Sequence, residues 1–339
     1  DALPISLGVA VAHVPGASGV EANGLKLAIH EQGSGLPVIM CHGFPELAFS
    51  WRHQLPAVAA AGFRAIAPDQ RGYGRTVDAA TGRIPDGVEA YDMEHLTGDM
   101  VAMMDAMGID KAVFCGHDWG GFVVWQMPLR HPDRVAGVIG VNTPFIPRGP
   151  IEPITAMREA YGDDMYIVYF QQPGVADELF GKDIPKSLRF WYRKSAVTLE
   201  DFDKAAPDAS KNLALTKLFE VPESEWGGDA LLTPEEAAYY EAAFARTGFT
   251  GGLNWYRNFT RNWQRSENLP DRVDVPCLMI SAANDVVLRP ELTDGMEQFC
   301  PDLEKHVIAD CGHWTQAEKP DELNALITDW LTRRFSTGS

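Results

Sequence analysis

The fold is decided by the stretch Cys115-Gly116-His117-Asp118-Trp119-Gly120-Gly121. The apolar run Ala112–Cys115 leads into this stretch and predicts a buried strand. A helical pattern follows from Trp119 and ends near His131-Pro132. A strand, a turn of small residues and a helix in this order are typical of a nucleophile elbow, in which a sharp turn holds one side chain clear of the backbone. The glycines leave room for that turn.

The side chain that this elbow would present is Asp118, where a serine is more usual. A carboxylate with an ordinary pKa of ~4 is already ionised at neutral pH and needs no base to activate it. It is suited to displacement at a saturated carbon, which leaves an alkyl ester that water and a base must then hydrolyse. The stretch therefore predicts a histidine and a second carboxylate further along the chain. The alternative is a structural Asp118 that caps the helix beginning at Trp119.

Length, charge and cysteine content limit the classes of protein to consider. The chain has 339 residues, of which 45% are hydrophobic, so it can bury a large core in one large α/β domain or in two domains. Its net charge of −18 argues against nucleic acid and anionic membrane surfaces as partners. No apolar run reaches the ~18 residues that a membrane span needs. Five cysteines without a CxxC motif suit a reducing compartment, and we expect a cytoplasmic protein.

Strand and helix patterns alternate along most of the chain, which predicts a mostly parallel sheet with flanking helices. Strands are expected at Leu25–His30, Pro37–Cys41, Phe63–Pro68, Ala112–Cys115, Val135–Val141, Val275–Ile280 and His306–Ile308, and helices at Met93–Met107 and Asp321–Arg334.

The α/β pattern is interrupted once. Three prolines between residues 144 and 150 mark a boundary, and residues 145–265 look helical without a convincing strand. Within them, Thr233-Pro234-Glu235-Glu236 is a capping box that begins a helix, which Gly248 follows. We therefore expect an N-terminal arm at 1–20, an α/β core at 21–144 and 266–339, and a helical insertion at 145–265.

The expected acid and base both follow strand ends. Asp285 and His313 lie in loops after the last two predicted strands, where open α/β sheets place their sites. The order nucleophile, acid, histidine is that of the α/β-hydrolase triad. Asp285 could instead be a turn residue, and Asp302 and Asp310 are rival acids.

Two further histidines, His42 and His117, lie in the same region. Each stands beside a backbone turn, and we interpret both as packing or loop-fixing residues.

Several motifs in this order resemble the soluble epoxide hydrolases of the α/β-hydrolase fold, over residues 24 to 333. The resemblance rests on His42–Glu46, Arg71–Gly74, Gly116–Gly121, Asn142–Phe145, Tyr169–Gly174, Asn254–Asn258 and Gly312–Gln316. It implies an eight-stranded, mostly parallel sheet with an inserted helical cap. It also implies hydrolysis of epoxides to vicinal diols through an ester on Asp118, with water activated by His313 and Asp285.

The resemblance further implies that Tyr166 and Tyr256 act as acids on the epoxide oxygen. Opening an epoxide produces a strongly basic alkoxide, and a phenol with a pKa of ~10 can hydrogen-bond the oxygen and supply a proton. From the pattern alone Tyr161 and Tyr169 are rivals of Tyr166, and any single tyrosine could be a core residue.

Helical spacing supports Tyr256 independently. In a helix beginning at Leu253, the positions of Leu253, Tyr256, Thr260 and Trp263 share a largely apolar face, which we expect to point into the pocket.

Backbone N–H groups of Phe44 and Trp119 are expected to form an oxyanion hole, because one follows the first strand-end turn and the other follows the nucleophile. The aromatic residues suggest an apolar pocket, for which the candidates are Phe170, Trp191, Trp255 and Trp314.

No cofactor or metal is expected, because no His/Cys cluster has zinc-like spacing and the Gly-rich loop lacks the lysine of a P-loop. The expected partners are a small apolar epoxide and water, and a homodimer is possible. The main alternative is a dehalogenase that uses the same aspartate, with Trp119 as a possible halide donor. A ligand-binding receptor on a hydrolase fold is a second alternative, which turnover would distinguish.

Overall fold

The computed structural model describes residues 17–205 and 212–336. Its centre is a nine-stranded sheet in the order β1-β2-β4-β3-β6-β7-β8-β9, with the two-residue strand β5 pairing with β2 off this path. The strands are β1 Ser18–Ala22, β2 Leu25–Gly33, β3 Pro37–Cys41, β4 Arg64–Pro68, β5 Val77–Asp78, β6 Ala112–His117, β7 Val135–Val141, β8 Cys277–Ala282 and β9 Leu303–Ile308. The expected count of eight is correct for the main path and omits β5.

The sheet is parallel from β4 to β9 and antiparallel at β1 and β2. Because the carboxyl ends of parallel strands meet at one edge, the loops that follow β3, β6, β8 and β9 come together there. These loops carry Phe44, Asp118, Asp285 and His313, respectively.

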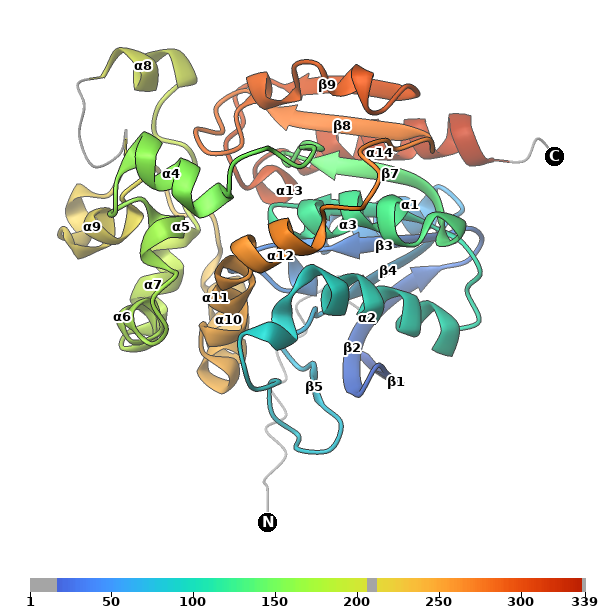
Figure 1. The fold of residues 1–339 in the computed structure, drawn as a ribbon, viewed down its shortest axis with the longest axis horizontal. Helices are drawn as coiled ribbons and strands as arrows, with labels where there is room; N and C mark the ends of the chain where they lie inside the picture. Colours follow the sequence, from blue (N-terminus) through green and yellow to red (C-terminus); the bar gives the residue numbers. More distant parts are fainter. Residues whose placement is uncertain (1–16, 206–211, 337–339) are drawn as a thin grey trace.

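Helices cover both faces of this sheet (Figure 1). Alternate residues of β3 belong to different clusters, with Val38 and Met40 on one face and Ile39 and Cys41 on the other, as the two-residue period of a strand requires. One face packs against α1 Gln54–Ala60 and α14 Pro320–Phe335, and the other against α2 Met93–Ala106 and α3 Trp119–Arg130. Short helices η1 Ala48–Trp51, η2 Glu89–Tyr91, η3 Pro132–Arg134, η5 Pro290–Thr293, η6 Met296–Gln298 and α13 Thr315–Glu318 lie in the connections.

Between β7 and β8 the described chain is helical, and these helices gather at one side of the sheet (Figure 1). The predicted capping box is present, since Thr233 N donates to Glu236 Oε2 at 3.0 Å and Glu236 N donates to Thr233 Oγ1 at 3.3 Å. The helices are α4 Pro153–Tyr161, α5 Tyr166–Tyr169, α6 Val175–Gly181, α7 Ile184–Trp191, α8 Leu199–Lys204, α9 Leu215–Glu220, η4 Glu223–Glu225, α10 Pro234–Thr247, α11 Thr250–Arg257 and α12 Phe259–Arg265.

Two expectations need correction. Strand β1 begins at Ser18, inside the arm expected at 1–20, because this segment pairs antiparallel with β2; residues 1–16 of that arm lie outside the described residues. The helix expected to continue from Leu253 is interrupted at Asn258, whose ψ of 4° departs from helical geometry. The Asn258 amide donates to the carbonyl oxygens of Val88 and Asn254, which ties the break to the core.

None of the helices in the described part of the chain is both long enough and apolar enough to cross a membrane.

Candidate active site

The elbow at the end of β6 places Asp118 in an unusual backbone conformation, with φ 51° and ψ −123°. The neighbouring glycines are required by contact, since a Cβ at Gly120 would lie 2.0 Å from the Cys41 carbonyl oxygen. A Cβ at Gly121 would lie 2.3 Å from Cβ of Thr143. The Asp118 side chain makes none of the side-chain capping hydrogen bonds that a structural N-cap aspartate would make.

The carboxylate of Asp118 is held by backbone donors at the positions expected for an oxyanion hole. Phe44 N donates to Asp118 Oδ1 at 2.7 Å, and the Trp119 N–H also bonds to the carboxylate. Thr143 Oγ1 donates to the Asp118 carbonyl oxygen at 2.8 Å, and this hydrogen bond holds the backbone of the strained turn in place. One carboxylate oxygen is therefore fixed, while Oδ2 faces the histidine.

His313 lies between the two carboxylates. Its Nδ1 is 2.8 Å from Asp285 Oδ2, and its Nε2 is 3.7 Å from Asp118 Oδ2. The rival acids lie elsewhere, since Asp302 pairs with Arg334 and Asp310 occupies an exposed turn. The structure thus brings together the three residues whose order along the chain suggested a triad.

Asp285 is itself positioned by several donors. Its Oδ1 accepts the N–H groups of Val287 at 3.0 Å and Leu288 at 2.9 Å, and its Oδ2 accepts Asn142 Nδ2 at 2.8 Å. Asn142 is also bonded by Thr315 Oγ1 at 2.7 Å, so its amide orientation is fixed. In the sequence Asn142 appears only as part of the motif Asn142–Phe145, although its place directly after β7 was a signal for a role at the site.

The three groups perturb one another's pKa values. Burial opposes ionisation of Asp285. The charge of His313 and the hydrogen bonds that Asp285 accepts nevertheless hold the pKa of Asp285 well below its ordinary value. Burial would lower the pKa of His313. The charge of Asp285, the hydrogen bond between Asp285 and His313, and the charge of Asp118 instead raise the pKa of His313 to about 9. Burial raises the pKa of Asp118, against the charge of His313 and the two backbone donors.

This coupling predicts a pH-dependent stability. Folded His313 keeps its proton up to about pH 9, whereas the unfolded side chain loses it near 6.5. The contribution of protonated His313 to the free energy of unfolding is therefore complete below pH 6.5 and is lost as the pH rises through about 9. Over this window the free energy of unfolding of the wild type should fall by about 2–3 kcal/mol relative to His313→Gln. Urea unfolding of both proteins across the window measures this, and parallel pH profiles would contradict it.

His42 and His117 have the loop-fixing positions that were expected. His42 Nε2 accepts the Gln70 N–H at 3.0 Å, and its Nδ1 lies 2.9 Å from the Gly43 carbonyl oxygen, so the ring braces the loop that carries Phe44. His117 lies 3.0 Å from Glu46 Oε2 and 2.7 Å from the His313 carbonyl oxygen.

Glu46 completes this support and was not selected from the sequence. Burial would raise its pKa, but His117 lowers the pKa of Glu46 to about 2, so the carboxylate is ionised. It accepts the Gly43 N–H and Gln316 Nε2, which joins the loop after β3 to α13. Its position in the quoted motif His42–Glu46 was the signal that could have identified it.

Two tyrosine side chains face Asp118 from the helical region. Tyr166 begins α5 and Tyr256 lies in α11, and their ring centroids are 5.9 Å apart. Burial, followed by the charge of Asp118, raises the pKa of both phenols, so both carry their protons. Of the rivals, Tyr161 is 43% exposed, and Tyr169 is not among the residues that line the cavity described next.

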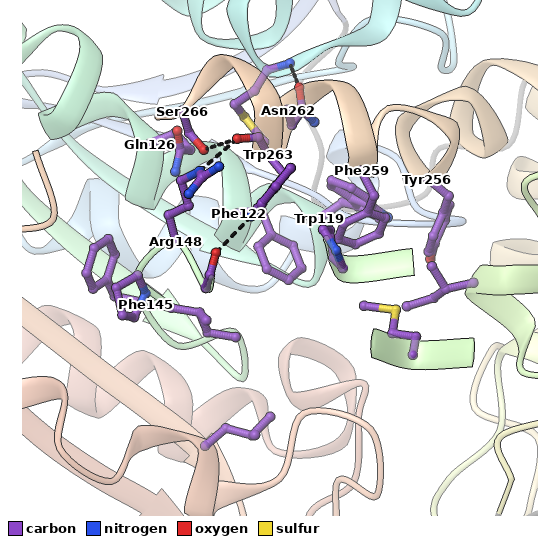
Figure 2. A pocket seen from close by; sticks show the side chains of 18 of the residues that line it. Trp119, Phe122, Gln126, Phe145, Arg148, Tyr256, Phe259, Asn262, Trp263 and Ser266 are labelled. Carbon is purple, nitrogen blue, oxygen red and sulfur yellow. Dashed lines mark hydrogen bonds between the residues drawn. The ribbon is translucent and has the colours of Figure 1, made fainter. Parts of the chain in front are cut away.

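A cavity of about 520 Å³ opens beside Asp118 (Figure 2). It is lined by Asp118, Trp119, Tyr166 and Tyr256 at the site, and by residues of the loop after β7, α3, α4, α12 and η5. Its walls are mainly apolar, with Phe122, Phe145, Met157, Phe259 and Trp263 among them.

The aromatic residues expected to form the pocket do not line this cavity. Phe170 packs behind Tyr256 with its ring centroid 5.1 Å away, and Trp255 Nε1 donates to the Arg71 carbonyl oxygen at 3.1 Å. Trp314 Nε1 donates to the Trp191 carbonyl oxygen at 2.8 Å. These residues pack on the core side of the site and do not face the cavity.

Within residues 17–205 and 212–336, no group of three or more His, Cys, Asp or Glu side chains is arranged to hold a metal ion.

Comparison with known proteins gives a consistent result. A family model described as the alpha/beta hydrolase fold matches residues 37–320. Epoxide hydrolase A of Mycobacterium tuberculosis is 41% identical over 325 residues, which are 92% of this chain and 96% of that protein. Bifunctional epoxide hydrolase 2 of Mus musculus is 42% identical over 321 residues, or 91% of this chain, and the match spans 54% of the mouse protein.

Solved structures agree with these relatives. The crystal structure of epoxide hydrolase A from Mycobacterium thermoresistibile superposes with a TM-score of 0.82 at 39% identity, covering 94% of this chain and 98% of that one. An epoxide hydrolase of Vigna radiata gives a TM-score of 0.80 at 32% identity, covering 95% and 99% of the two chains.

Proposed function

The chain belongs to the epoxide hydrolases of the α/β-hydrolase fold, and from that membership we propose that it converts epoxides to vicinal diols through an ester on Asp118. The observation that carries the mechanism is the arrangement around Asp118. This elbow carboxylate faces two protonated phenols across an apolar cavity, with His313 and Asp285 behind it.

In the first step, Asp118 Oδ2 attacks one epoxide carbon from the side opposite the C–O bond. Oδ1 is occupied by the Phe44 N–H, which leaves Oδ2 as the oxygen with freedom to react. The C–O bond breaks as the new C–O bond to Asp118 forms, and the released oxygen takes a proton from Tyr166 or Tyr256. Both phenols come from the helical region 145–265, which we propose acts as a cap over the site.

In the second step, His313 Nε2 removes a proton from water, and the hydroxide adds to the side-chain carbonyl carbon of Asp118. The oxyanion that develops there is stabilised by the Phe44 and Trp119 N–H groups. The bond to the alkyl oxygen then breaks, and the leaving oxygen takes the proton of the added hydroxyl group, which releases the diol and the Asp118 carboxylate. The proton held by His313 returns to the phenolate left by the first step, so both side chains regain their starting states. Asp285 contributes most to the raised pKa of His313, and Asp118 adds to it. Ester formation removes the Asp118 charge, which lowers the pKa of His313 before the histidine acts as the base.

The two phenols provide the test of this proposal. In the double variant Tyr166→Phe/Tyr256→Phe, the rate of diol formation should fall by about 10²–10⁴-fold, which is the usual contribution of general acid catalysis. Wild type and variant are compared on styrene oxide, a trans-disubstituted epoxide, a long-chain epoxide and a haloalkane of similar size.

Halide release that survives in the double variant, with no diol formed from any epoxide by the wild type, would refute the proposal in favour of a dehalogenase. The relatives and solved structures described above are named as epoxide hydrolases, which does not favour that alternative.

The reaction as proposed needs only a small apolar epoxide and water. We propose the cytoplasm as the compartment, because the five cysteines are free and buried.

A further inference from the structure

The cavity differs chemically between its two ends (Figure 2). Asp118 and Tyr256 lie at the proposed reacting end, and Figure 2 shows Arg148 away from Tyr256, with Phe122 between them. Trp263, which contacts Arg148, lies in α12, the helix that follows α11 and Tyr256. Mainly apolar lining side chains, Phe122 among them, therefore separate the reacting groups from the guanidinium.

Arg148 is held in place by Trp263. Its Nε donates to the Trp263 carbonyl oxygen at 3.0 Å, and its guanidinium lies 4.1 Å from the centroid of the indole ring. Trp263 Nε1 in turn donates to the Gly149 carbonyl oxygen at 2.8 Å. This reciprocal pair joins the loop after β7 to α12 and fixes the plane of the guanidinium, which lowers the entropy lost when it binds a further group.

The terminal nitrogens of Arg148 have no hydrogen-bond or ion-pair partner among residues 17–205 and 212–336. Asp271 also lines the cavity, but it is exposed and does not bond to Arg148. The N–H groups of the two terminal nitrogens of Arg148 are therefore available to hydrogen-bond an acceptor group on a ligand.

Apart from Asp271, the lining near Arg148 is uncharged and includes the polar side chains of Gln126 and Ser266 (Figure 2). Four lining side chains are exposed large hydrophobic groups, and they come from the loop after β7, α4 and η5: Ile146, Ile151, Tyr161 and Leu292. An apolar channel with one preorganised cation at its open end matches a ligand that is apolar along its length and anionic at one end.

We propose that Arg148 is a specificity-determining residue that binds an anionic group, such as a carboxylate, on an epoxide whose ring lies at Asp118. An apolar spacer separates the anion from the ring. This inference rests on the proposed function. The inference concerns which epoxides bind best and not how they react, because the reacting groups lie at the other end of the cavity.

The test uses the terminal epoxide of undecenoic acid and its methyl ester, which differ in the negative charge and in one methyl group. For Arg148→Gln, kcat/KM for the acid should fall roughly fivefold at low salt, mainly through KM, while the ester is unchanged. Arg148→Lys should recover much of the loss. Asp271→Asn should shift the acid-to-ester ratio in the opposite direction. Arg83→Gln, an exposed change of the same charge away from the cavity, is the matched control.

Equal loss on acid and ester in Arg148→Gln would show that Arg148 only clamps the loop, and would overturn the proposal. An unchanged acid-to-ester ratio would also overturn it. A further expectation is that the difference between acid and ester shrinks in ~1 M salt, because exposed charges are then screened. Failure of the wild type to hydrolyse even the neutral ester would count against the proposed function itself, which separates the two outcomes.

Discussion

Replacing Asp118 by alanine is expected to abolish epoxide turnover, with a loss of at least about 10⁴-fold in kcat/KM. In the proposed mechanism both chemical steps pass through this carboxylate, first as the nucleophile and then as the ester carbonyl that water attacks. Neighbouring carboxylates cannot substitute, because Asp285 is engaged by His313, Asn142 and two backbone N–H groups. The measurement is initial-rate diol formation from an epoxide that the wild type hydrolyses.

Asp118→Gly serves as the companion variant. The φ of 51° and ψ of −123° at this position strain any residue with a Cβ, and glycine accepts them. Asp118→Gly should therefore be about 1 kcal/mol more stable than Asp118→Ala and equally inactive. Urea unfolding establishes that both variants are folded. Retention of activity within tenfold of the wild type in either folded variant would exclude Asp118 as the nucleophile.

His313→Gln is expected to form the ester and then stall, so that the enzyme accumulates in the alkylated form. Attack by Asp118 does not require the histidine as a base, whereas hydrolysis does, and removal of a general base typically costs roughly 10²–10⁴-fold. Intact-mass analysis after mixing with excess epoxide should show the protein heavier by the mass of one substrate molecule. Peptide mapping should place the added mass on Asp118.

The choice of pH matters for this experiment. The charge of His313 lowers the pKa of Asp118 against the effect of burial, so its removal raises that pKa and leaves less of the carboxylate ionised. The reaction is best run at mildly alkaline pH, with Asp118→Ala/His313→Gln as the control that cannot be alkylated. A turning-over wild type together with an unmodified His313→Gln protein would contradict the ester mechanism.

Local sequence predicted much of the scaffold, because the elements concerned carry their own signals. The strand at β6, the glycine-rich turn and α3 were expected within a few residues of their observed bounds, and the capping box at Thr233 begins α10 as predicted. The three residues Asp118, Asp285 and His313 followed from a rule of topology. Parallel strands end at one edge of the sheet, so residues directly after those ends must meet.

The residues behind the site were harder to select. Asn142 and Glu46 act through hydrogen bonds to partners far along the chain, and nothing in their own neighbourhood shows which partner a side chain will find. The break at Asn258 has the same cause, because an asparagine is tolerated in a helical pattern until a distant carbonyl, here that of Val88, provides a better partner.

The sequence by itself therefore predicted the α/β-hydrolase fold and the candidate residues Asp118, Asp285 and His313, since periodicity is a local property and the order of residues after strand ends can be read along the chain. Only the tertiary structure decided which side chains face the cavity. Phe170 and Trp255 turn toward the core, while Phe122, Phe259 and Arg148 line the cavity. Orientation of short helices is set by packing against distant elements, and that information is present only when the chain is folded.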